Sequence, residues 1–164
     1  MAKINDILRL IALSILFGGS TAVVFVAVTL VKAATANGIP VREAASNNAP
    51  AFIGFAVIAA AAAFILLACE AVDFLIVRKR LKPLSKLVLT RYGASILCAI
   101  ATAVFAFGLV PPMKELQPLI KTDEAKAQEF GRLHETSRIV FGGTIVFALV
   151  ALVMQGLIPA TTRE

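Results

Sequence analysis

Two carboxylates three residues apart are the first side chains in this sequence whose types and spacing could do chemistry. Glu70 and Asp73 lie near the end of an apolar run and share one face of the helix that this run predicts. The rise of a helix places Glu70 roughly 10–12 Å inside the end of the run. An ionised carboxylate there needs a cation, a proton or the interior of a bundle. The pair therefore predicts either an interhelical ion pair, with Arg91 or Arg78 as the cation, or a proton or cation site.

A second polar group surrounds the single histidine, His134. It shares one stripe of a predicted helix with Phe130 and Ser137, and Arg138 follows it by one turn. The stripe could present a proton-accepting imidazole, or it could hold a hydrogen-bonded histidine that anchors the helix end. One histidine does not provide a multi-histidine metal site or a bis-histidine haem site in a single chain, so we predict no metal and no cofactor.

The two cysteines, Cys69 and Cys98, both lie inside apolar runs. They could face each other as a thiol pair on neighbouring helices, or they could serve as small packing residues. The sequence has no CxxC spacing and no P-loop, GxSxG or HExxH motif, and no GxGxxG precedes a helix. We predict that the protein is not an enzyme.

These side chains are carried by four long apolar segments. Of the 164 residues 59% are hydrophobic, and the mean hydropathy is +0.89, whereas soluble domains are about 45–50% apolar. A helix needs about 20 apolar residues to cross a bilayer. The sequence therefore predicts an all-α integral membrane four-helix bundle, with residues 1–164 as a single domain and spans at about 10–31, 51–77, 92–110 and 139–158.

A basic connector gives these spans a direction. The stretch 78–91 has no acidic residue and six basic ones, which are Arg78, Lys79, Arg80, Lys82, Lys86 and Arg91. Lys and Arg near span ends resist translocation, so we predict that this loop and both termini are cytoplasmic. The net charge of +6 then reflects topology and attraction to anionic lipid, and we predict no binding of nucleic acid, because no aromatic residues are interleaved with the charges.

Local patterns predict how the outer side is built. Pro111-Pro112 is expected to end the third helix. A helix over about 122–138, capped by Thr122, is expected to lead into the fourth span. Close packing, within the chain or with partners, is expected along two stripes of small residues at four-residue spacing, which are Ser14, Gly18 and Ala22, and Ala94, Cys98, Thr102 and Ala106.

The segments Pro112-Met-Lys-Glu-Leu and Glu129-Phe-Gly-Arg-Leu-His-Glu-Thr-Ser, with Asp123 between them, resemble the transmembrane protein 205-like family, whose bacterial members carry domain of unknown function 4149. The family pattern F-x-x-(L/Y/F)-H-x-x-S and its paired small residues in span one fall on Phe130, Leu133, His134, Ser137 and Gly18-Gly19. The chain departs from the family at Glu135, often Gly, and at Phe141, often Asn. The resemblance implies a four-span membrane protein with no settled biochemical activity.

These patterns predict a multi-pass, non-enzymatic accessory or interaction component, and the resemblance together with the size of the chain implies a bacterial inner membrane. Its expected partners are the lipid bilayer and either a second copy of the chain or another membrane protein. The alternative is a small oligomeric transporter or proton-coupled carrier that uses Glu70 on the inner side and His134 on the outer side. The candidate functional residues are His134, Ser137, Arg138, Glu70 and Asp73.

Overall fold

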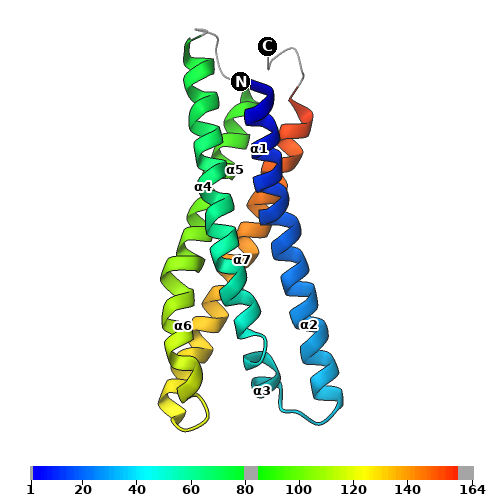
Figure 1. Ribbon diagram of the computed structural model, residues 1–164, viewed down its shortest axis with the longest axis vertical. Coiled ribbons are helices and arrows are strands. Elements are labelled where there is room, and N and C mark those ends of the chain that lie inside the picture. Colours follow the sequence, from blue (N-terminus) through cyan, green and yellow to red (C-terminus); the bar gives the residue numbers. More distant parts are fainter. Residues whose placement is uncertain (1, 80–84, 159–164) are drawn as a thin grey trace.

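The computed structural model describes residues 2–79 and 85–158, and every regular element in these ranges is helical. Four long helical rods run nearly parallel along the molecule (Figure 1). In chain order the elements are α1 (Ala2–Ser14), η1 (Ile15–Gly19), α2 (Ser20–Ala36), α3 (Val41–Ser46), α4 (Ala49–Lys79), α5 (Lys86–Ala103), η2 (Val104–Leu109), α6 (Val110–Leu116), η3 (Gln117–Leu119) and α7 (Glu124–Leu157). The elements η1 and η2 are π-helical, and η3 is a 3₁₀ turn.

Each rod is long and apolar enough to cross a membrane, and the four stretches are Lys3–Ala36, Glu43–Val77, Lys86–Leu119 and Glu124–Leu157. Large apolar side chains point outward, and Phe25, Phe64 and Phe107 are each more than 70% exposed. Such a surface suits contact with lipid, because lipid tails are as apolar as these side chains. The predicted fold class is therefore confirmed as an all-α four-helix bundle able to span a membrane. Helical structure also continues past the predicted spans.

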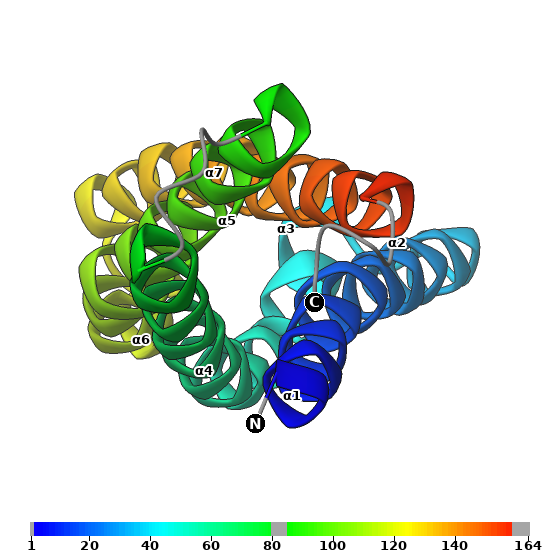
Figure 2. The same ribbon diagram turned by 90° about the horizontal axis from the view of Figure 1, so that it is seen from above.

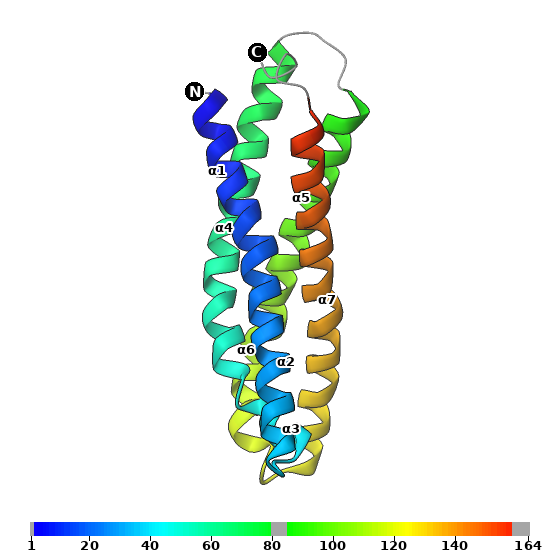
Figure 3. The same ribbon diagram turned by 90° about the vertical axis from the view of Figure 1, so that its right-hand side faces the viewer.

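The two ends of the bundle differ. The first residues of α1 and α5 and the last residues of α4 and α7 lie together at one end, which we call the terminal end (Figure 3). The opposite end carries α3 and the turn between η3 and α7, and we call it the α3 end. Viewed along the bundle, the rods follow one another around its axis (Figure 2). Toward the α3 end α2 leans away from α4 and α7 (Figure 1).

The core is built from small residues at the terminal end and from aromatic rings at the α3 end. One buried cluster combines alanines with Leu13, Leu16 and Leu66. The other centres on Phe141, whose ring lies 4.6 Å from that of Phe105 and also meets Phe52 and Phe55 edge-on. Small residues let helices approach closely, whereas large rings keep them apart, so the composition of the core agrees with the divergence of α2.

The connector between the second and third rods is shorter than the predicted stretch 78–91. α4 continues to Lys79, and α5 begins at Lys86, where the Ser85 hydroxyl caps it by accepting a hydrogen bond from the Val88 amide at 3.3 Å. Arg91 is therefore a buried helical residue. Residues 80–84 and the side chains of Arg78 and Lys79 lie outside the described part of the chain.

The prediction that Pro111-Pro112 ends the third helix is wrong. Both prolines lie in the first turn of α6, and the rod continues through Leu116. A proline lacks an amide hydrogen and its ring clashes with the carbonyl four residues earlier. The π-helical segment η2, immediately before α6, widens the backbone at this point, and the first turn of a helix tolerates the missing donor.

The predicted cap at Thr122 is also wrong. The Asp123 side chain caps α7 by accepting a hydrogen bond from the Lys126 amide at 3.1 Å. The Thr122 hydroxyl instead donates to the Leu119 carbonyl at 3.3 Å. A carboxylate is the stronger acceptor beside the positive end of a helix dipole, so the cap moves one residue along the chain.

Of the two small-residue stripes, one packs inside the bundle and the other does not. Ala94, Cys98, Thr102 and Ala106 are all buried. The Cys98 thiol donates to the Thr144 carbonyl at 3.5 Å, and the Thr102 and Thr144 hydroxyls lie 3.5 Å apart, so this stripe faces α7. Ser14, Gly18 and Ala22 are exposed on the outside of the first rod, so close packing of this stripe within the chain is a wrong prediction.

Candidate functional site

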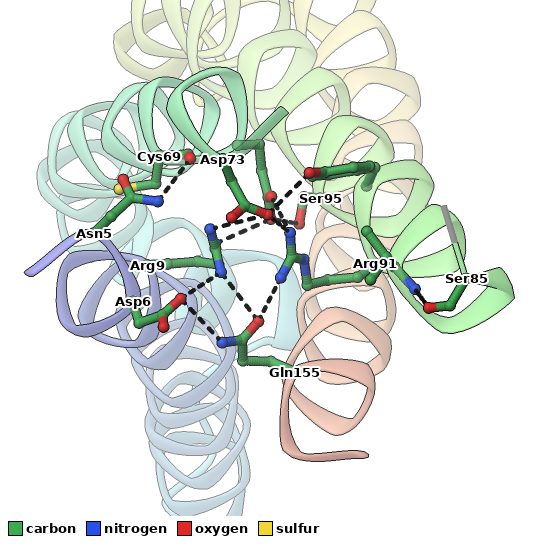
Figure 4. A network of polar contacts seen from close by, with 12 residues as sticks. Asn5, Asp6, Arg9, Cys69, Asp73, Ser85, Arg91, Ser95 and Gln155 are labelled. Atoms are coloured by element: carbon green, nitrogen blue, oxygen red, sulfur yellow. Dashed lines mark hydrogen bonds and ion pairs between the residues drawn. The ribbon is translucent and has the colours of Figure 1, made fainter. Parts of the chain in front are cut away.

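The terminal end holds a buried group of charged and amide side chains that joins all four rods (Figure 4). We call it the ionic cluster; it comprises Asp6 and Arg9 of α1, Glu70 and Asp73 of α4, Arg91 of α5 and Gln155 of α7. Arg9 is 0% exposed and Arg91 is 3% exposed, so both guanidinium groups depend on the protein for their hydrogen bonds.

Arg91 connects three of the four rods. Its Nη2 donates to Glu70 Oε2 at 3.0 Å and to Asp73 Oδ2, and its Nη1 donates to Gln155 Oε1 at 2.8 Å. The structure thus brings Glu70 and Asp73 together with Arg91, one of the two cations predicted from the sequence. The side chain of Arg78, the other predicted cation, lies outside the described residues.

Arg9 closes the cluster from the first rod. Its Nη1 donates to Asp6 Oδ1 at 2.9 Å and to Gln155 Oε1 at 3.1 Å. Its Nε and Nη2 lie in ion-pair range of Glu70 Oε1 and Asp73 Oδ2, at 3.4 and 3.6 Å, without hydrogen-bond geometry. The two guanidiniums therefore share both carboxylates of α4 and converge on one amide oxygen of Gln155.

Further hydroxyls hold the carboxylates in place. Ser95 Oγ donates to Glu70 Oε1 at 2.8 Å, and the Tyr92 hydroxyl donates to Asp73 Oδ2 at 2.9 Å. The Arg91 guanidinium also lies 4.8 Å from the centre of the Tyr92 ring, a cation–π contact. Each carboxylate of α4 therefore has a neutral donor besides its arginines, whereas Arg9 Nε, Arg9 Nη2 and Arg91 Nε are buried without a hydrogen-bond partner among the described residues.

Three residues of the ionic cluster, Asp6, Arg9 and Gln155, were not predicted from the sequence as site residues. Asp6 and Arg9 are spaced i, i+3 at the start of an apolar run, and Gln155 is the only strongly polar side chain in residues 139–158. A lone amide inside a span is costly unless it is bonded, and that signal could have identified Gln155. Its pairing with Arg9, 146 residues away, depends on which faces of α1 and α7 turn inward.

The α3 end contains an apolar cavity of about 520 Å³ between α2, α4, the third rod and α7. Its walls are aliphatic and aromatic, and include Val24, Val28, Phe52, Ile53, Phe105, Phe141 and Ile145. Polar side chains line it at Lys32, Asn48, His134, Ser137 and Arg138. The predicted residues His134, Ser137 and Arg138 therefore share one cavity, at the opposite end of the bundle from Glu70 and Asp73.

The polar residues of α7 at this cavity are largely engaged. His134 is half-buried and stacks on Phe130, with ring centroids 6.2 Å apart and planes within 6°. The Ser137 hydroxyl donates to the His134 backbone carbonyl at 2.7 Å, and Arg138 Nη1 donates to Glu135 at 2.9 Å. The Ser137 hydroxyl is thus bonded to the backbone rather than to the imidazole.

Neither cysteine forms a disulfide, and both are buried. In residues 2–79 and 85–158, no group of three or more His, Cys, Asp or Glu side chains could hold a metal ion. Cys98 packs in the core against α7. The backbone carbonyl of Cys69 accepts a hydrogen bond from Asn5 at 3.0 Å, which adds a further link between α1 and α4 beside the ionic cluster.

Comparison with protein-family models, with curated proteins and with solved structures finds no match for this chain. The fold and the two sites define its class, a four-helix bundle with four membrane-capable rods, an ionic cluster at one end and an apolar cavity at the other. The resemblance to the transmembrane protein 205-like family stays a prediction.

Proposed function

We propose that this chain is a non-enzymatic membrane protein that holds an apolar ligand in the cavity at its α3 end, and so acts as an accessory or interaction component. The cavity carries this proposal. Its volume of about 520 Å³ lies within the roughly 300–1,000 Å³ of small-molecule sites, which are also mostly apolar with few polar groups. The ionic cluster joins the four rods at the other end, so the cavity can stay open without loss of the bundle.

The contacts of the polar side chains favour binding over chemistry. A nucleophilic hydroxyl needs a base within hydrogen-bond reach, whereas Ser137 donates to a backbone carbonyl. The imidazole of His134 is parallel to the ring of Phe130, with centroids 6.2 Å apart. The resemblance to the transmembrane protein 205-like family supports the same proposal, because it implies a four-span membrane protein without a settled activity.

Filling the cavity should remove the bound ligand. Gly142 lines the cavity, and a Cβ added there would meet nothing within 4 Å, so Gly142→Leu adds a side chain to the open space. We expect native mass spectrometry of the protein, purified in mild detergent, to show an adduct on the wild type and at least a several-fold weaker adduct on Gly142→Leu.

Gly108→Leu is the matched control, because Gly108 also has open space at its Cβ but is exposed and does not line the cavity. It should keep the adduct. A wild type that carries no adduct, or one that survives equally in Gly142→Leu, would contradict the proposed function.

We also propose that the terminal end faces the cytoplasm of a bacterial cell and that the α3 end faces outward. The basic residues of the connector and the positive-inside rule support this orientation. In spheroplasts, Asn37→Cys at the α3 end should react with a membrane-impermeant maleimide, whereas Lys86→Cys should react only after lysis. The native cysteines Cys69 and Cys98 are 4% and 0% exposed, so background labelling by the maleimide should be low. The reverse labelling pattern would show the opposite orientation.

One observation favours a second candidate, a proton-coupled carrier. The ionic cluster has three carboxylates for two guanidiniums, and the side chains of Asp6 and Asp73 are 25% and 24% exposed, so one carboxylate has no matching guanidinium and two are partly open to solvent. A Glu70→Gln variant that folds normally and loses a proton-coupled flux in proteoliposomes would favour the carrier. Normal folding with unchanged flux would remove this candidate.

A further inference from the structure

The interior of the cavity is chemically suited to a hydrocarbon chain. Its apolar walls include Val24 on α2, Phe52 on α4, Phe105 on η2 and Ile145 on α7. None of these side chains offers a hydrogen bond, so a polar occupant would be desolvated there without compensation. An alkyl chain loses nothing on entry, because it exchanges lipid contacts for protein contacts of the same kind.

Two cations, Lys32 and Arg138, line the cavity. Lys32 follows Val24 by eight residues, and Arg138 precedes Ile145 by seven, so each lies roughly 10–12 Å along its helix from the apolar interior. Both also lie directly outside the uncharged runs 10–31 and 139–158. Two helices from opposite ends of the sequence therefore place a positive charge where the headgroups of a bilayer begin.

Both cations can bind an anion. Among the described residues no ion pair includes Lys32, whose side chain is exposed. Arg138 uses Nη1 for Glu135, in a pair whose side chains are 67% and 63% exposed. Such an exposed pair contributes little, and the rest of the guanidinium can still donate to a phosphate.

From this arrangement we propose that the cavity binds one acyl chain of an anionic phospholipid and that Lys32 and Arg138 bind its phosphate. This inference rests on the proposed function and names the ligand class. The cavity supplies the apolar contact and the two cations select the headgroup, so a zwitterionic lipid of the same chain length should bind more weakly.

The absence of tryptophan from the sequence makes the test direct, because an introduced tryptophan is the only one in the protein. Phe52→Trp places it in the cavity wall, and Ile53→Trp provides a second reporter if the first disturbs the contact with Phe141. Phe25→Trp is the control, because Phe25 is 71% exposed on the outer face of α2. Each variant is reconstituted in phosphatidylcholine vesicles with increasing fractions of phosphatidylglycerol brominated on its acyl chain.

We expect half-quenching of Phe52→Trp at about a thirtyfold lower fraction of brominated phosphatidylglycerol than of brominated phosphatidylcholine, because the two basic side chains near the headgroups each contribute about 1 kcal/mol. Phe25→Trp should show no such preference. Adding Lys32→Gln and Arg138→Gln to Phe52→Trp should abolish the preference. Lys126→Gln should leave it unchanged, because this exposed cation does not line the cavity.

Equal quenching of Phe52→Trp by both brominated lipids would overturn the headgroup assignment and leave the proposed function standing. Retention of the preference after loss of both Lys32 and Arg138 would also overturn it. Absence of quenching of both Phe52→Trp and Ile53→Trp, with either lipid, would show that no acyl chain enters the cavity.

Discussion

Arg91→Met should lower the free energy of unfolding of the bundle by about 3–5 kcal/mol, the usual cost of removing one partner from a buried ion pair. Methionine fills much of the same volume, so the loss is mainly one of charge. It leaves Asp6, Glu70 and Asp73 with Arg9 as the only cation of the ionic cluster. Denaturation of the purified protein in mixed micelles, followed by circular dichroism, measures the change.

Variants that change the net charge of the ionic cluster distinguish the loss of charge pairing in Arg91→Met from a general loss of packing. Glu70→Gln leaves two carboxylates and two guanidiniums, so it should cost only about 1–2 kcal/mol for the weakened hydrogen bonds. Adding Glu70→Gln to Arg91→Met should recover part of the stability, a coupling that two independent sites would not show. Arg138→Gln, at an exposed pair, should change stability by less than about 1 kcal/mol. If Arg91→Met costs no more than Arg138→Gln, the ionic cluster does not stabilise the bundle.

The sequence predicts the fold because long uncharged runs leave a chain few alternatives in a membrane. It also predicts the contact of Glu70 and Asp73 with Arg91, since these charges lie near the facing ends of consecutive spans. The participation of Arg9 and Gln155 in the ionic cluster could not be derived in the same way. Their contact joins the first and last rods, and it requires the rotation of each helix about its own axis, which an apolar run of nearly uniform hydrophobicity does not specify.

The cavity is harder still to predict from sequence. The stripe of Phe130, His134 and Ser137 on one helical face was visible in the sequence, and these three residues do line the cavity. Whether that face meets another helix or an open space depends on the divergence of α2, a property of the whole bundle. The sequence therefore did not suggest that Lys32 and Arg138 line the same cavity, although Lys32 directly follows one apolar run and Arg138 directly precedes another.

The small-residue stripe of the first rod shows how a shift of one residue changes an interpretation. Spacing favoured Gly18 as the packing residue, but Gly18 is exposed and a Cβ added to it would meet nothing within 4 Å. Gly19 is the glycine that faces α4. A Cβ there would lie 2.8 Å from Phe55 Cε2 and 3.0 Å from Cζ. Spacing alone does not distinguish the lipid-facing side of a helix from the side that packs.

Gly19→Ala should therefore lower the free energy of unfolding by about 1–3 kcal/mol through overpacking. Phe55 cannot move freely away, because its ring meets Phe141 edge-on with centroids 6.1 Å apart. The better helix propensity of alanine offsets up to about 1 kcal/mol of this cost. The same denaturation measurement in micelles, repeated across a set of variants, gives the comparison.

Gly18→Ala is the matched control, since it adds the same methyl group one position earlier, where the space is open. It should be neutral or raise stability by up to about 1 kcal/mol. Phe55→Leu, added to Gly19→Ala, should restore part of the loss, because the shorter side chain withdraws from the added methyl group. Equal behaviour of the two alanine variants would mean that the first rod does not pack against α4 at Gly19, and that the divergence of α2 begins closer to the terminal end.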